Sequence, residues 1–172
     1  SRGNATLVES GDTCVMVDCG FSVAETQRRL ARLAKTPQDI HAILVTHEHS
    51  DHIGGVAGFA RRFGIPVWMT AGTSVMHDAT TFPSLDWFDA HTAFALGALH
   101  VTPFPVPNDA REPCQFVFGD AAVRLGILTD TGSITAHIRA QLDGCQALLL
   151  ESNHDPAMLA GGPYPPSLKQ RV

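Results

Sequence analysis

Short apolar runs alternate with polar, glycine-containing segments along the chain, and most of these runs have the length and the β-branched content of strands. The predicted strands cover residues 6–9, 14–18, 42–45, 65–70, 99–105, 114–118, 123–129 and 147–151. The first two flank the turn Ser10-Gly11-Asp12, so they are predicted to form a hairpin. Residues 71–87 are predicted to be a short helical or irregular stretch.

Helical periodicity separates several of these strands. Ser22 followed by Glu25 has the spacing of a capping box, and it predicts a helix whose Leu30 and Leu33 face inward. The spacing of Val56 and Phe59 predicts a second helix after residue 52. Because strands and helices are mixed throughout, we expect an α/β fold in which helices cover sheets.

Composition agrees with a single domain over residues 1–172. The chain has 44% hydrophobic and 17% charged residues, enough apolar content to bury a core without cross-links. A net charge of -5 gives no general attraction to nucleic acid or to an anionic membrane. The apolar runs are too short to span a bilayer and no secretory signal is visible, so we expect no membrane association and a cytoplasmic location, with protein partners left open. The four cysteines lack C-x-x-C spacing, which favours buried, reduced thiols.

A cluster of candidate metal ligands follows the apolar run at 42–45. Its members are His47, His49, Asp51 and His52. His47 and His49 are two residues apart, so they project to the same side of an extended segment. Asp51 and His52 fall where a helix is predicted to begin, which turns their side chains toward a second position. Because these side chains face two positions, the pattern predicts two adjacent divalent ions. Imidazole and carboxylate ligands suit zinc, manganese or iron. The alternative, a surface cluster of histidines, is disfavoured by four ligands at this spacing directly after a buried strand.

The segment H-x-H-x-D-H after a hydrophobic strand resembles the signature of the metallo-β-lactamase superfamily. Residues 15–20 resemble the family's early strand, whose Asp18 would support the metal site, and residues 128–132 resemble the later strand, whose Asp130 would bridge two ions. Residues 3–9, 104–110 and 162–172 are similar to the YycJ/WalJ-like branch of bacterial hydrolases. The resemblance implies a metallo-β-lactamase-like αββα sandwich.

The resemblance also implies a metal-dependent hydrolase that uses a metal-activated hydroxide. In this scheme one ion is held by His47, His49 and residue 108, and the other by Asp51, His52 and a further histidine. Asp51 and Asp130 then have catalytic roles as well. The branch implies a phosphodiesterase or DNA exonuclease, with nucleic acid as the substrate. A thioesterase or lactonase is the alternative enzyme, because the same hydroxide can attack a carbonyl.

Two departures from the family pattern change these expectations. Asn108 stands where this branch is expected to carry a histidine, and an amide oxygen is a weaker ligand for zinc-like ions than imidazole. A catalytically weakened metal-binding regulatory protein is therefore a third hypothesis, whereas Asn108 as a turn residue after Pro107 is the structural alternative. The family's last histidine would lie beyond Val172, so we expect a fragment of the fold, incomplete at its C-terminus, and we also consider a missing first strand.

Two further residues outside the cluster are candidates for contact with the substrate. His154 follows the strand predicted at 147–151 and is a candidate proton donor or substrate contact, although a structural histidine bonded to the backbone is the alternative. Arg111, close to Asn108, is a candidate contact for a substrate phosphate.

Overall fold

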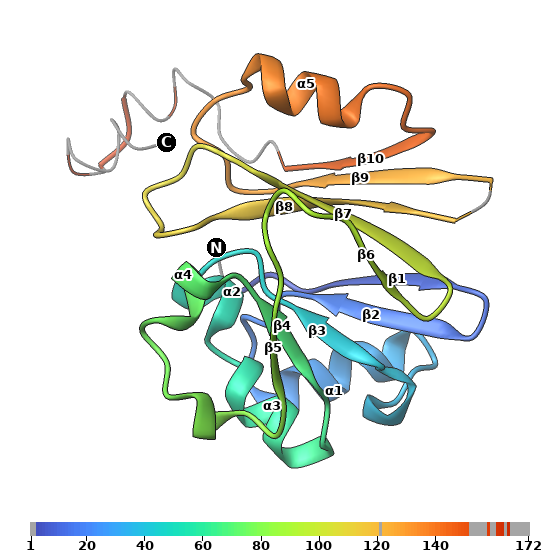
Figure 1. Ribbon diagram of the computed structural model, residues 1–172. Helices are drawn as coiled ribbons and strands as arrows, with labels where there is room; N and C mark the ends of the chain where they lie inside the picture. Colours follow the sequence, from blue (N-terminus) through green and yellow to red (C-terminus); the bar gives the residue numbers. More distant parts are fainter. Residues whose placement is uncertain (1–2, 121, 152–157, 159–160, 164, 166–172) are drawn as a thin grey trace.

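Two five-stranded sheets lie face to face in the computed structural model (Figure 1), which describes residues 3–120, 122–151, 158, 161–163 and 165. The first sheet has the order β1-β2-β3-β4-β5, and the second has the order β10-β9-β8-β7-β6. Each sheet is therefore built from one continuous part of the chain, with the N-terminal half in the first and the C-terminal half in the second.

The first sheet is mainly parallel. Its strands are β1 (Thr6–Ser10), β2 (Thr13–Val17), β3 (Ala42–Leu44), β4 (Val67–Met69) and β5 (Leu85–Trp87). β1 and β2 form the expected antiparallel hairpin, and β2 to β5 pair in parallel. Val17 in β2 lies opposite Leu44 in β3, so the residues that follow these two strands emerge at the same edge of the sheet.

The second sheet is mainly antiparallel. Its strands are β6 (Phe94–Leu96), β7 (Leu99–Pro105), β8 (Cys114–Gly119), β9 (Arg124–Leu128) and β10 (Ala147–Leu150). Only β9 and β10 pair in parallel. A parallel pair needs a crossover connection, and α5 (Ala136–Leu142) supplies it.

Helices cover the outer face of each sheet, as Figure 1 shows. α1 (Val23–Arg32) and α3 (Val56–Phe63) lie against the first sheet, and α5 lies against the second. The remaining short elements are α2 (Ser50–Ile53), α4 (Ala71–Ser74) and the 3-10 turns Pro37–Asp39 and Ala79–Thr81. The expected αββα sandwich is confirmed.

Three hydrophobic clusters join the four layers. Met16 and Phe59 belong to the cluster between the first sheet and its helices, whereas Val15 and Phe116 belong to the cluster between the two sheets. Ile138 of α5 is buried in the third cluster, against the second sheet. Neighbours such as Val15 and Met16 point to opposite faces of a strand. Because both faces of the first sheet are covered, its inner strands β2, β3 and β4 are almost entirely apolar.

The sequence located eight of the ten strands and the two helices that cover the first sheet. It missed β6 and α5, and the expectation that residues 71–87 are helical or irregular was wrong for β5. β5 and β6 have three residues each and carry too little alternation to be recognised by period, whereas β3 and β4, equally short, lie in the longer predicted runs 42–45 and 65–70. The expectation that Leu33 faces inward was also wrong: it is the C-cap that follows α1 and is 62% exposed. Within the described part of the chain, no helix combines the length and the apolar character needed to cross a bilayer.

Candidate metal centre

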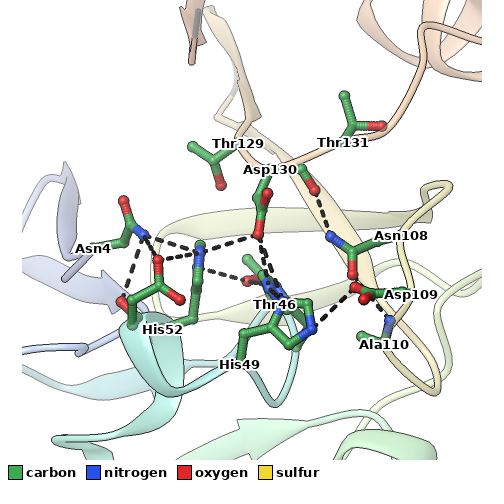
Figure 2. Close-up of polar contacts among 12 residues, drawn as sticks. Asn4, Thr46, His49, His52, Asn108, Asp109, Ala110, Thr129, Asp130 and Thr131 are labelled. Atoms are coloured by element: carbon green, nitrogen blue, oxygen red, sulfur yellow. Dashed lines mark hydrogen bonds and ion pairs between the residues drawn. The ribbon is translucent and has the colours of Figure 1, made fainter. Parts of the chain in front are cut away.

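The polar side chains singled out in the sequence meet where strands of both sheets end (Figure 2). Asp18 directly follows β2, His47 comes shortly after β3, and Asp130 lies two residues beyond the end of β9. His49 is the N-cap of α2, and His52 lies inside that helix. The predicted turn from strand to helix at this point is confirmed, and it brings His52 back toward His47, with ring centroids 4.1 Å apart.

Asp18 is the buried anchor of the cluster. It is 2% exposed, its Oδ1 accepts a hydrogen bond from the Thr46 backbone N–H at 2.8 Å, and its Oδ2 accepts one from the Thr46 hydroxyl at 2.8 Å. The same Oδ2 lies 2.8 Å from His52 Nδ1. Its backbone has a φ of 59°, which few residues other than glycine adopt. Such conformations concentrate at functional sites, where the surrounding contacts hold them.

Hydrogen-bond chemistry fixes which nitrogens of His47 and His52 face the centre. Thr46 donates its one hydroxyl hydrogen to Asp18, so its Oγ1 accepts from His47 Nδ1, 2.9 Å away. Asp18, as a carboxylate, accepts from His52 Nδ1. The Nδ1 atoms therefore carry protons, and the Nε2 atoms of both rings point toward Asp130.

Asp130 faces three imidazole nitrogens at once. Its Oδ2 lies 3.3 Å from His47 Nε2, 3.7 Å from His49 Nδ1 and 3.6 Å from His52 Nε2. Its φ is 49°, so both acidic residues of the cluster that follow strands have left-handed backbones. A hydrogen bond with His47, opposed by partial burial, lowers the pKa of the Asp130 carboxyl to about 2. Asp130 is therefore ionised at neutral pH.

Several nitrogen and oxygen lone pairs of the cluster face one another, and a positive charge between them would stabilise this arrangement. Donor atoms of His47, His52 and Asp130 all lie within 4.8 Å of one another, and His47 Nε2 is only 3.0 Å from His49 Nδ1. Burial opposes the protonation of His52, but its hydrogen bond and charge interaction with Asp18, with smaller effects of Asp51 and Asp130, raise its pKa. Imidazole and carboxylate atoms in this arrangement fit a divalent cation.

Asp51 lies beside this cluster, and Asn4 contacts it there. Asp51 Oδ2 is 3.8 Å from His52 Nε2. The Asn4 side-chain amide donates to Asp51 Oδ2 at 3.3 Å and lies 2.9 Å from His52 Nε2. Asp51 thus lies next to His52 Nε2, the nitrogen that also faces Asp130.

Asn108 uses both of its polar side-chain atoms on the backbone. Its Nδ2 donates to the Asp130 carbonyl at 2.8 Å, and its Oδ1 accepts from the Ala110 N–H at 2.9 Å. These contacts agree with the alternative in which Asn108 is a turn residue. Arg111 lies in the same loop with an exposed side chain, and its backbone N–H donates to Glu48 Oε1 at 2.8 Å. His154 lies outside the described residues.

Among the described residues, sequence reasoning missed the contacts that Asn4, Thr46 and Asp109 make with the cluster, and that of Glu151, whose Oε2 accepts from the Asp130 N–H at 3.0 Å. Thr46 and Asp109 are direct neighbours of the candidates His47 and Asn108, and Asn4 lies in the segment 3–9 that carries the branch resemblance. Adjacency was therefore an available signal. It could not show which neighbour points at an imidazole, because that depends on the path of each loop.

The comparisons with known proteins agree with this geometry. The family model of the metallo-beta-lactamase superfamily matches residues 1–145. The exodeoxyribonuclease YycJ of Bacillus anthracis is 34% identical over 176 residues, which cover 100% of this chain and 67% of that protein. The exodeoxyribonuclease WalJ of Streptococcus pneumoniae (strain D39) is 32% identical over 178 residues, which cover 100% of this chain and 66% of that protein. The chain thus spans about two thirds of the length of these relatives.

Solved structures share the fold at low sequence identity. Zn²⁺-bound PqqB from Methylobacterium extorquens superposes with a TM-score of 0.77 at 17% identity, covering 99% of this chain and 69% of that one. YhfI from Bacillus subtilis gives a TM-score of 0.71 at 17% identity, covering 86% of this chain and 62% of that one. The family expected from the H-x-H-x-D-H segment is confirmed, and the chain belongs to the metallo-β-lactamase superfamily as a YycJ/WalJ-like member.

Proposed function

We propose that this chain is the metal-binding domain, over residues 1–172, of a hydrolase that cleaves phosphodiester bonds in DNA as an exonuclease. Membership of the superfamily and the names of its relatives support a metal-dependent hydrolase of the nuclease or phosphodiesterase type. Because the chain spans about two thirds of those relatives, the DNA substrate and the exonuclease activity are proposals.

The observation that carries the proposal is the approach of three imidazole nitrogens to one carboxylate oxygen, Asp130 Oδ2, at 3.3 to 3.7 Å. The proposed ligands of two divalent ions, zinc or manganese with iron also compatible, are His47, His49, Asp51, His52 and Asp130. When bound, such ions lower the pKa of water and stabilise negative charge on the attacked phosphate.

The chain's own residues prepare this site for an anionic substrate. Asp18 and Thr46 hold His52 and His47 in one orientation through buried hydrogen bonds. Asp130 is partly exposed, so its carboxylate can accept a hydrogen bond from the attacking water on the solvent side. Arg111 offers an exposed cation from a neighbouring loop for the substrate phosphate, and His154 is the proposed proton donor.

Asn108 is proposed to act through the backbone of Asp130. Its side-chain amide donates a hydrogen bond to the carbonyl of Asp130, the residue that faces the three histidines, so Asn108 can support the site without being a ligand. In this role Asn108, which stands where the branch is expected to carry a histidine, supplies no ligand but keeps the other ligands in place. The weakened regulatory protein remains the opposing hypothesis.

The test compares substrates with one metal-loaded preparation of the full-length protein. Linear DNA, circular DNA, a thioester and a lactone are incubated with protein reconstituted in zinc or manganese, with Asp130→Asn protein as the matched control. Metal-dependent release of nucleotides from linear but not circular DNA is the expected result. Preferred hydrolysis of the thioester or lactone would favour the alternative enzyme, and no turnover above the control with either metal would favour the regulatory protein.

A further inference from the structure

We propose that Asp109 is a positioning residue that orients the His49 imidazole, so that Nδ1 and not Nε2 is presented to the metal cation. This inference rests on the proposed metal-dependent function. Asp109 lies in the loop between β7 and β8, outside the H-x-H-x-D-H segment.

The two nitrogens of His49 face different partners. Nε2 lies 3.1 Å from Asp109 Oδ1, whereas Nδ1 lies 3.0 Å from His47 Nε2 and 3.7 Å from Asp130 Oδ2 (Figure 2). An ionised carboxylate can only accept hydrogen bonds, so the contact with Asp109 places a proton on Nε2. The lone pair then remains on Nδ1, the nitrogen that faces the cluster. Rotating the ring by 180° would turn carbon atoms toward both Asp109 and the cluster, so both polar contacts would be lost.

His49 needs this support more than the other two imidazoles. The side chains of His47 and His52 are 1% exposed and have buried partners in Thr46 and Asp18. The His49 side chain is 26% exposed, so its outer nitrogen would otherwise face water, which accepts either ring orientation. A carboxylate on the outer nitrogen of a metal-binding histidine also raises the basicity of the ring.

The loop that carries Asp109 is held at both of its sides. The Arg111 N–H donates to Glu48 Oε1, and Glu48 lies between His47 and His49 in the sequence. On the other side, the Gly132 N–H donates to the Pro107 carbonyl at 2.8 Å. Asp109 is therefore presented to His49 from a loop tied to both ligand-bearing segments. A Glu48→Ala substitution should loosen this tie and weaken metal binding in the same direction as loss of Asp109, by a smaller factor.

The experiment uses the full-length protein, with Asp109→Ala as the main variant and Asp109→Asn as a milder one that keeps an acceptor oxygen. Zinc and Co²⁺ affinities are measured in competition with a chelator. We expect Asp109→Ala to weaken binding about 10- to 100-fold, the usual effect of removing such a partner of a ligand. Asp109→Asn should fall between Asp109→Ala and the parent. The exposed turn residue Asp12, changed to Ala, is the matched control and should leave the affinity unchanged.

Imidazole ¹⁵N spectra of the metal-free protein provide the readout that a merely structural role would not move. The parent should show His49 protonated on Nε2, and Asp109→Ala should show a mixture of the Nε2–H and Nδ1–H tautomers, with an unchanged thermal midpoint because Asp109 is 45% exposed. A parent His49 protonated on Nδ1 alone, or a folded Asp109→Ala variant with parental metal affinity, would overturn the proposal. A parent that binds no metal while its spectra show the Asp109 effect would instead count against the proposed function.

Discussion

The Asp18 carboxylate and the His52 imidazole form a buried pair in which Oδ2 lies 2.8 Å from Nδ1. Both side chains are at most 3% exposed, and a charge so deeply buried is costly unless it is paired and hydrogen-bonded. Asp18 meets this condition with two further hydrogen bonds from Thr46. The negative charge thus placed behind His52 favours a positive charge in front of it, which is the requirement for binding a cation.

Loss of the Asp18 carboxylate should damage both stability and metal binding. Asp18→Ala leaves the Thr46 N–H and hydroxyl and the His52 Nδ1–H without their acceptor. We expect the free energy of unfolding of the metal-free protein to fall by roughly 2–4 kcal/mol, since buried hydrogen bonds to a charged group are lost. Denaturant unfolding measures this, and Asp12→Ala is the exposed control. A change within 0.5 kcal/mol would show that Asp18 is not the anchor, taking about that value as the usual limit for surface sites.

Asp130→Asn should separate activity from folding. The Asp130 side chain is 45% exposed, and its backbone contacts with Asn108 and Glu151 do not need the carboxylate. The amide cannot balance the charge of two cations, so we expect hydrolysis to fall by about 10²-fold or more, the scale of losing one electrostatic contribution at an active site. Circular dichroism and thermal unfolding without metal should remain those of the parent. Near-parental hydrolysis by the folded variant would contradict the proposed role of Asp130.

Metal removal should lower the stability of the full-length protein reversibly. An ion that binds only the folded state stabilises it by mass action, by about 2.7 kcal/mol at a free metal concentration 100 times the dissociation constant. Thermal unfolding is measured after chelation and again after adding zinc or manganese. The midpoint should rise with metal concentration in the parent and much less in a His47→Ala variant. An equal rise in the two proteins would mean that the stabilising ion binds elsewhere.

How far the sequence could predict the site depended on distance along the chain. His47, His49, Asp51 and His52 lie within six positions, so spacing alone gathered them. Asp130 needed the family resemblance, because it lies 78 positions after His52 in the sequence. The contact between Asp109 and His49 also joins distant segments, but no motif marks it, so only the folded loop reveals it.

The same reasoning explains the strands and the one ambiguous residue. Long apolar runs such as β7 were predicted at their observed bounds, whereas β5 and β6 are too short to show a period. For Asn108 the sequence left a ligand and a turn residue as alternatives. Its bond with the Ala110 N–H is local and typical of a turn, whereas its bond to the Asp130 carbonyl joins residues far apart in the sequence, which sequence patterns do not specify.

Gly55, the N-cap of α3, and Gly58, inside α3, should differ in how replacement by alanine changes the stability of the protein. A Cβ at Gly55 would lie 1.8 Å from the Phe21 carbonyl oxygen, because the loop after β2 crosses the backbone there. A Cβ at Gly58, in α3, would meet only a Val23 methyl at 3.4 Å. We expect Gly55→Ala to destabilise the protein by more than about 2 kcal/mol, since the clash is with backbone that must move. Gly58→Ala should be neutral or stabilising by up to about 1 kcal/mol through helix propensity.

Denaturant unfolding measures the stability of both variants. Equal effects of Gly55→Ala and Gly58→Ala would argue against the close contact between Gly55 and the Phe21 backbone. The comparison also reports on the site, because Gly55 N–H donates to the Cys19 carbonyl beside Asp18. A shift of this contact should move Asp18 relative to His52, so Gly55→Ala protein that still folds should bind metal more weakly than Gly58→Ala protein.

The two possible roles of Asn108, backbone brace and metal ligand, give different results on substitution. If its side chain braces the Asp130 carbonyl, Asn108→Ala removes two hydrogen bonds and should lower the metal-free free energy of unfolding by about 1–2 kcal/mol. Metal affinity should also fall, because the Asp130 backbone, with its φ of 49°, is held less firmly. If Asn108 is instead a ligand, the metal-free stability should not change, and only the affinity should fall.

The Asn108→His variant separates the two roles further. A ligand role predicts a metal affinity above that of the parent, since imidazole is the better ligand for zinc. The brace predicts no gain, because the ring cannot replace both the donor to Asp130 and the acceptor for Ala110. Zinc titrations and unfolding of the parent and both variants measure these differences, and a gain in affinity for Asn108→His with unchanged metal-free stability for Asn108→Ala would place residue 108 among the ligands.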